Sequence, residues 1–142
     1  MAPVVLALRE CPEIESKVCV TGQHREMLDQ VLTLFGINPD ADLALMRPNQ
    51  QLAQLTSEVL NNLDSVLEDI QPDWVLVQGD TTTAMAAALA AFYRHIQVGH
   101  VEAGLRTYDK WQPFPEEINR RMISAIADLH FAPTSLSQSN LL

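Results

Sequence analysis

Short apolar runs alternate along this chain with longer stretches in which apolar residues recur at helical spacing. The short runs are rich in β-branched and bulky side chains, which is typical of buried strands. They lie at residues 17–21, 74–77, 97–101 and 129–132, with a weaker extended piece at 42–45. The longer stretches predict helices at residues 1–10, 24–35, 50–70 and 115–128, with an Ala-rich helix opening at 81–83 and a last helix at 134.

This alternation of strands and helices predicts the fold class. Strand–helix–strand units of these lengths are typical of an α/β protein with a Rossmann-like parallel sheet and helices on both faces. The 142 residues are enough for a single domain with a real core, and we expect one domain over residues 1–142. Neither GxGxxG nor a Walker loop occurs, so the glycine-rich phosphate sites of dinucleotide-binding and P-loop proteins are not supported.

The composition of the chain limits which binding partners and which cellular location are expected. The net charge of −9 argues against nucleic acid as a partner. No apolar run approaches the ~20 residues that span a membrane, so no membrane partner is expected. Two cysteines make no disulfide framework, which suits a reducing, cytoplasmic setting. No spacing of Cys and His residues predicts a metal site.

Acidic residues stand where predicted strands and loops turn into helices. Asp80 and Glu102 each follow an apolar strand, and Glu116 opens a helix behind a proline. In open α/β sheets, ligands bind at the carboxyl ends of the strands. Carboxylates that lie close together raise one another's pKa, a cost that packing alone does not require. The pattern therefore predicts a ligand site, and paired carboxylates are typical of acid–base chemistry on sugars.

These residues also have structural interpretations. Asp80 is suited to cap the N-terminus of the Ala-rich helix. Glu116 complements the dipole of its helix and is placed to pair on the surface with Arg120, four residues later. His100 and Glu102 lie two residues apart on a strand, so they are predicted to share a face.

An arginine beyond the second of these strands adds a positive charge to the predicted site. Arg106 follows Gly104, which allows the backbone to approach a ligand closely. Its guanidinium is suited to hold Glu102 or a phosphate group. The residues by themselves do not name the reaction.

Four ordered motifs are more specific. They are TGQHREM at residues 21–27, VQGDTTT at 77–83, GHVEAGLR at 99–106 and PEEINR at 115–120. Together they resemble the non-hydrolysing UDP-N-acetylglucosamine 2-epimerases of bacteria, and the similarity covers essentially all 142 residues.

The resemblance implies a reaction and a site. It implies interconversion of UDP-N-acetylglucosamine (UDP-GlcNAc) and UDP-N-acetylmannosamine (UDP-ManNAc), by elimination and re-addition of UDP with inversion at C2. It implies no metal or redox cofactor. The catalytic residues would be Asp80, Glu102 and Glu116. The substrate-binding residues would be Asp80, Glu102, Arg106, Arg120 and His100. The turn at Gln23 and His24 resembles the part of the family that contacts a second, activating UDP-GlcNAc.

The resemblance also implies an architecture that this chain matches in part. The family has a two-domain fold of the glycosyltransferase-B type, with the active site between two Rossmann-like domains, and it is homodimeric. Residues 1–142 would form the N-terminal domain, without the family's first strand and its Gly-Thr-Arg-Pro-Glu loop, and without the second domain. We therefore expect the chain alone to have marginal stability and little or no activity.

Three alternative interpretations stay open at this point. The nearest is a hydrolysing epimerase that releases free ManNAc and UDP. A second is a non-catalytic, truncated remnant. A third is a receiver-like domain phosphorylated on Asp80, but that domain requires an acidic cluster after its first strand and a lysine at a late strand end, and neither is present.

Overall fold

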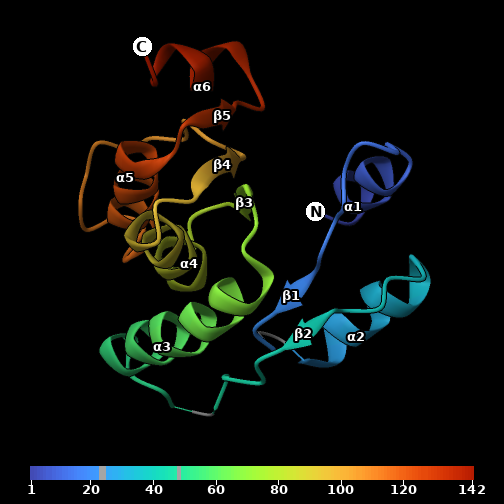
Figure 1. Cartoon of the computed structure of the whole chain (residues 1–142). Coiled ribbons are helices and arrows are strands. Elements are labelled where there is room, and N and C mark those ends of the chain that lie inside the picture. The colour runs from blue at the N-terminus through green and yellow to red at the C-terminus, as the bar shows by residue number, and fades with distance from the viewer. Residues whose placement is uncertain (23–24, 48) are drawn as a thin grey trace. The chain divides into compact units, whose positions relative to one another are not determined.

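The computed structural model describes residues 1–22, 25–47 and 49–142, and they divide into two units, Met1–Gln50 and Gln51–Leu142 (Figure 1). The first unit contains helices α1 (Ala2–Arg9) and α2 (Arg25–Leu34) and strands β1 (Cys19–Val20) and β2 (Ala41–Asp42). The two strands pair in parallel. The sequence predicts a single domain over residues 1–142. The division into two compact units does not test whether they form one domain, so this stays a prediction.

The first unit buries few apolar side chains. Among the described residues of this unit, the buried hydrophobic ones are Val20, Ile37 and Leu45. Helix α1 begins without a side-chain cap. The apolar stripe predicted for residues 24–35 exists on α2, but it is not buried: Met27 is 64% exposed and no described residue of α2 is buried. This helix therefore keeps its amphipathic pattern without burying its apolar face.

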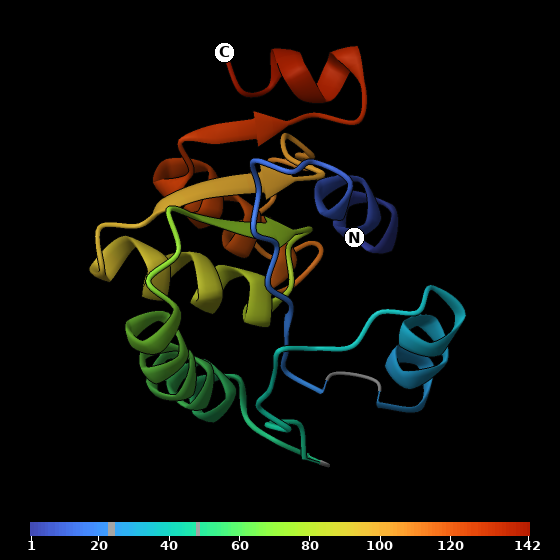
Figure 2. The same ribbon diagram turned by 45° about the vertical axis from the view of Figure 1, so that its right-hand side comes forward.

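The second unit contains most of the core. Its helices are α3 (Leu52–Ile70), α4 (Thr82–Tyr93), α5 (Glu116–Ile126) and α6 (Ser135–Ser139). Its strands are β3 (Trp74–Gln78), β4 (Gln97–Val101) and β5 (Leu129–Phe131). The strands form a parallel sheet in the order β3-β4-β5, and Figure 2 shows the three arrows pointing the same way. The predicted α/β class with parallel strands is confirmed.

Helix α4 forms the centre of this unit. It packs against α3, against α5 and against strands β3 and β4. Seven of its residues are buried, most of them alanines, because a helix that is apolar all round belongs in a core. Alanine side chains are small enough to let its neighbours approach closely. Helix α3 buries Leu55, Val59, Leu63 and Leu67, at the helical spacing that the sequence predicts, whereas Leu52 at its start is 42% exposed.

Parallel strands end at a common edge, and this edge positions the candidate site. In the register of β3 and β4, Gln78 lies opposite Val101, the last residue of each strand. The turns that follow carry Asp80 and Glu102. Both acidic residues therefore leave the sheet at the same edge, which is where open α/β sheets bind ligands.

Among the described residues, no helix combines the length and the apolar character needed to cross a membrane.

Candidate active site

The turn from β3 to α4 leaves the carboxylate of Asp80 free of helix capping. The helix begins at Thr82, and its N-cap is Thr81, whose hydroxyl accepts the backbone N–H of Ala84 at 3.1 Å. The prediction that Asp80 caps this helix is wrong. The helix begins one residue later than an Asp80 cap requires, so Thr81 occupies the N-cap position. Gly79, just before Asp80, turns the chain with a φ of +74°, in the left-handed region that glycine tolerates.

Two neighbouring residues of α5 hold this turn. The amide of Asn119 donates to the backbone carbonyl of Asp80 at 2.9 Å and to the hydroxyl of Thr82 at 3.4 Å. Arg120 Nη1 donates to Asp80 Oδ2 at 3.3 Å. Arg120, predicted to bind substrate, thus lies directly at the Asp80 carboxylate. Asn119 was missed because a lone Asn in a helix gives no pattern in the sequence.

Arg120 also pairs with an acidic residue of its own helix. The predicted surface pair between Glu116 and Arg120 is wrong: Arg120 Nε donates to Glu117 Oε2 at 2.9 Å, and Arg120 is only 6% exposed. Positions three apart on a helix share a face as readily as positions four apart. Here that face turns inward, toward the β3–α4 turn, so it is Glu117 and not Glu116 that meets Arg120.

Glu102 sits in an unusual backbone conformation at the end of β4. The strand ends at Val101, and Glu102 has a φ of +67°, which non-glycine residues adopt at a cost of about 1–2 kcal/mol. The two-residue alternation of a strand therefore breaks here. His100 is fully buried while Glu102 is exposed. That the two side chains share a face stays a prediction.

The carboxylate of Glu102 reaches back toward the β3 turn. Its Oε2 accepts from Gln78 Nε2 at 3.3 Å. A Cβ at Gly79 would lie 3.6 Å from the same oxygen, so Glu102 lies beside the residue that precedes Asp80. A strained residue at a strand end is a common feature of functional sites.

His100 supports the turn from inside the sheet. Its Nε2 lies 2.8 Å from the carbonyl oxygen of Gly79, which can only accept, so this nitrogen carries the proton. Burial lowers the pKa of His100, which favours the neutral ring. Its side chain is 0% exposed, so in this conformation it shapes the Gly79 turn. Direct contact of His100 with substrate stays a prediction.

Arg106 is directed to the protein rather than to Glu102. Its guanidinium donates to the carbonyl of Leu105 at 2.7 Å and to the hydroxyl of Ser124 on α5 at 3.0 Å. Burial lowers the pKa of Arg106. Among the described residues, its hydrogen-bond partners are thus Leu105 and Ser124 and not Glu102, and its substrate-binding role stays a prediction. Gln23 and His24, the predicted activator contacts, lie outside the described residues.

Electrostatics shows that the three predicted catalytic carboxylates converge. Burial raises the pKa of Asp80 above its usual value, Arg120 opposes this, and the negative charges of Glu116 and Glu102 raise the pKa further. Asp80 is thus a stronger base than a solvated aspartate, while an arginine stays beside it. This combination is typical of groups that exchange protons with a substrate.

Unsatisfied polar atoms gather at the same place. Within residues 51–142, the buried side-chain atoms that lack a hydrogen-bond partner are Thr83 Oγ1, His100 Nδ1, Glu116 Oε2 and Arg120 Nη2. Native proteins contain few such atoms. All four belong to residues of the β3–α4 turn, the end of β4 or the start of α5. A site that is to bind a polar ligand keeps such donors and acceptors available.

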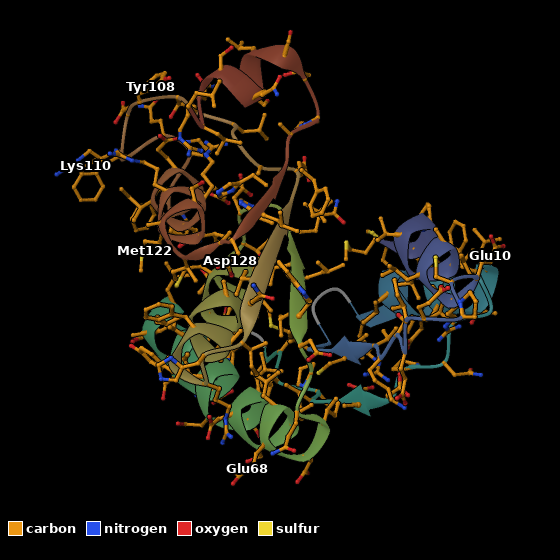
Figure 3. The ribbon with its side chains drawn as sticks, turned by 45° about the horizontal axis from the view of Figure 1, so that its top comes forward. Glu10, Glu68, Tyr108, Lys110, Met122 and Asp128 are labelled. Carbon is orange, nitrogen blue, oxygen red and sulfur yellow. The ribbon has the colours of Figure 1, made fainter. Side chains whose placement is uncertain are left out.

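The loop between β4 and α5 is held to the start of α5 by hydrogen bonds. Figure 3 shows Tyr108 and Lys110 on it, at the opposite end of the unit from Glu68 on α3. The backbone N–H groups of Thr107 and Tyr108 donate to the carboxylate of Glu117 at 3.0 and 3.3 Å. Across the described residues, no group of three His, Cys, Asp or Glu side chains is arranged to hold a metal ion.

Comparison with known proteins gives consistent results. A sequence model of the family described as UDP-N-acetylglucosamine 2-epimerase matches residues 6–142. UDP-N-acetylglucosamine 2-epimerases of Bacillus subtilis and Neisseria meningitidis are 62% and 59% identical to the whole chain, which covers 37% and 38% of their lengths. The chain thus spans little more than a third of these curated relatives.

Solved structures give the same result. The Neisseria meningitidis UDP-GlcNAc 2-epimerase bound to UDP-GlcNAc matches 99% of this chain and 38% of its own, with a TM-score of 0.96 and 59% identity. The Methanocaldococcus jannaschii UDP-GlcNAc 2-epimerase in complex with UDP-GlcNAc and UDP matches the same shares, with a TM-score of 0.90 and 36% identity. These neighbours have the two-domain fold of the glycosyltransferase-B type, as predicted.

Proposed function

We propose, from the premise that this chain belongs to the UDP-N-acetylglucosamine 2-epimerase family, that it supplies the carboxylates that interconvert UDP-GlcNAc and UDP-ManNAc. The observation that carries the proposal is the convergence of Asp80, Glu102 and Glu116 at one edge of the sheet, with Arg120 on Asp80. Relatives solved with UDP-GlcNAc support this substrate class.

The proposed reaction needs a base and an acid near one carbon atom. A carboxylate takes the proton from C2 of the sugar, the C1–O bond to UDP breaks, and a C1–C2 double bond forms. The electron pair of the C2–H bond becomes the double bond, UDP leaves with the electron pair of the C1–O bond, and the product is 2-acetamidoglucal. Re-addition of UDP to C1, with a proton delivered to the opposite face of C2, gives the epimer. Every atom is returned, so no oxidant or reductant takes part.

The surroundings of each carboxylate suggest its role in the reaction. Asp80, whose pKa is raised by burial, is suited to remove or return the C2 proton, and Glu116 is suited to the opposite face or to charge that develops at C1. Glu102 is exposed at the edge and suited to the sugar hydroxyls. Arg120 orients Asp80.

Three features beyond the reaction are also proposals: a homodimer of the full-length protein, a cytoplasmic location, and a product used in polysaccharide biosynthesis.

The decisive experiment is proton NMR of UDP-GlcNAc in D2O with a chimera. In it the 142 residues replace the matched segment of the Bacillus subtilis relative, of which they cover 37%. We expect deuterium at C2 and formation of UDP-ManNAc with the chimera, and little or no exchange with the 142-residue chain alone. Absence of exchange in the chimera, under conditions where the unaltered relative is active, would overturn the proposal. Free ManNAc in place of UDP-ManNAc would favour the hydrolysing alternative.

A matched pair of variants ties the reaction to the site. Asp80→Asn in the chimera is expected to slow exchange by about 10²–10⁴-fold, the usual contribution of a general acid or base. Asp64→Asn is the control, because Asp64 also pairs with an arginine, Arg94, but at the surface of α3. Equal losses in the two variants would contradict a catalytic role for Asp80.

A further inference from the structure

Glu117 is a carboxylate in a position where charge is costly. Its side chain is 0% exposed and is among the largest fully buried side chains of the chain. A buried carboxylate is tolerated only when it is paired and hydrogen-bonded. An acidic residue that merely complements the helix dipole in the first turn of α5 gains this benefit at the surface and needs no burial. The burial of Glu117 therefore calls for another explanation.

The contacts of Glu117 supply one. Its Oε2 accepts from Arg120 Nε at 2.9 Å and from the backbone of Thr107 at 3.0 Å, and its Oε1 accepts from the backbone of Tyr108 at 3.3 Å. Burial by itself would raise the pKa of Glu117, but these donors outweigh it and hold the pKa below its usual value. Glu117 is thus an ionised anchor that connects α5 to the loop that follows β4.

Arg120 transmits this anchoring to the site. Its guanidinium is planar and presents its N–H groups in a fixed fork. When Nε is held by Glu117, the direction of Nη1 is set, and Nη1 is the atom that donates to Asp80 Oδ2 at 3.3 Å. A long arginine side chain held at one point only would have several rotamers available. Glu117 supplies the second point.

The charges around Asp80 make this arrangement consequential. Facing Asp80 are Arg120 and Glu116 from α5, Glu102 from the end of β4, and His100, which burial keeps neutral. Facing Glu117 are Arg120 and Arg106. Arg120 is therefore shared between two carboxylates. Its stabilisation of ionised Asp80 is weaker than it would be if Asp80 were its sole partner.

We propose that Glu117 is a positioning residue: it fixes Arg120 against Asp80 and shares the guanidinium charge, so that Asp80 stays available to accept a proton. Only the kinetic part of the test rests on the proposed function. Glutamine keeps an oxygen that can accept from Arg120 Nε, so Arg120 stays beside Asp80, but it removes the negative charge that shares the guanidinium. The ionised form of Asp80 is then favoured more strongly, which makes Asp80 a weaker base.

The first test needs no activity. In the 142-residue chain with ¹³C-labelled aspartate, the carboxyl signal of Asp80 is assigned by its loss in Asp80→Asn and titrated with pH. We expect the midpoint of Asp80 to fall in Glu117→Gln and to stay unchanged in Glu68→Gln, the matched control. Glu68 is an exposed partner of Arg94, so its removal changes the same charge elsewhere. An unchanged or higher midpoint in folded Glu117→Gln would overturn the proposal.

The second test uses the chimera described above. We expect Glu117→Gln to lower kcat by about 10- to 100-fold, because Asp80 becomes a weaker base, and to move the acidic limb of the kcat profile to lower pH. A loss of kcat without movement of that limb would mean a structural role only and would overturn the proposal. If Glu117→Gln fails to fold, Glu117→Asp keeps the charge with a shorter reach, and an unchanged kcat in that variant would overturn it as well.

The two tests separate the two proposals. A chimera that is inactive before any substitution would contradict the proposed function, and the titration of Asp80 in the 142-residue chain would still decide the role of Glu117.

Discussion

The carboxylate of Asp80 is unfavourable for the stability of the folded chain but suited to the proposed proton transfer. Burial raises its pKa, although Arg120 lies beside it. A group whose pKa is raised on folding contributes stability at low pH and loses it as the pH rises through that pKa. At neutral pH the ionised form therefore destabilises the folded chain.

The destabilising effect of ionised Asp80 can be tested by substitution. Asp80→Asn, which cannot ionise, is expected to raise the free energy of unfolding at pH 7 by about 0.5–1 kcal/mol, a size common for single stabilising substitutions. The gain should shrink as the pH falls toward the pKa of Asp80, because the native residue then becomes neutral too. Urea unfolding between pH 7 and pH 4, followed by circular dichroism, measures both effects.

Asp64→Asn is the control with the opposite sign. The hydrogen bond from Arg94 lowers the pKa of Asp64, so its ionised form is favoured in the folded chain. The asparagine variant should show no gain at pH 7. A gain of the same size at both positions would mean that burial of Asp80 is not the cause.

Helix α4 depends on its first turn for both its start and the site. Thr81 and Thr83 lie in this turn, two residues apart, but their hydroxyls differ in environment. The hydroxyl of Thr81 caps the helix, while the hydroxyl of Thr83 is buried without a partner. Sequence inspection alone treats the three successive threonines as equivalent.

The two positions therefore predict opposite effects. Thr81→Ala should lower the free energy of unfolding by about 1 kcal/mol, the typical effect of losing an N-cap. Thr83→Val keeps the shape of the side chain and removes an unsatisfied hydroxyl, so it should be neutral or slightly stabilising. Urea denaturation of both variants measures the difference. Equal destabilisation would show that Thr81 does not act as the cap.

The two units of the chain differ in how much they bury. Residues 51–142 contain the stripe of α3 and the nearly enclosed α4, whereas neither α1 nor α2 has a buried residue. Short helices are marginal in water without tertiary packing. Stability within this chain is thus expected to be uneven.

Hydrogen exchange measured by mass spectrometry tests this expectation. Backbone amides of α1 and α2 should exchange at least ~10-fold faster than those of α3 and α4, because local opening costs little where few side chains are buried. The comparison is made within one sample, so solution conditions are identical for all four helices. Equal protection of α2 and α4 would contradict it.

Local pattern was sufficient for much of the fold. The apolar run at residues 97–101 is the strand β4 (Gln97–Val101), and the four-residue repeat of α3 is its buried stripe. These features depend on neighbours along the chain, through side-chain alternation and helical periodicity, so the sequence shows them directly. The same holds for the place of Asp80 at a strand end and for the four motifs of the family.

The partners of the charged groups required the tertiary structure. The approach of α5 and β4 to the β3–α4 turn decides three features of the site. These are the acidic partner of Arg120, the residue that caps α4, and the conformation of Glu102 after its strand. The contacts that join these elements, Arg120 with Asp80 and Gln78 with Glu102, span 40 and 24 positions and carry no periodicity along the chain. Folding selects one arrangement among several that the residue types allow, and only packing makes that selection.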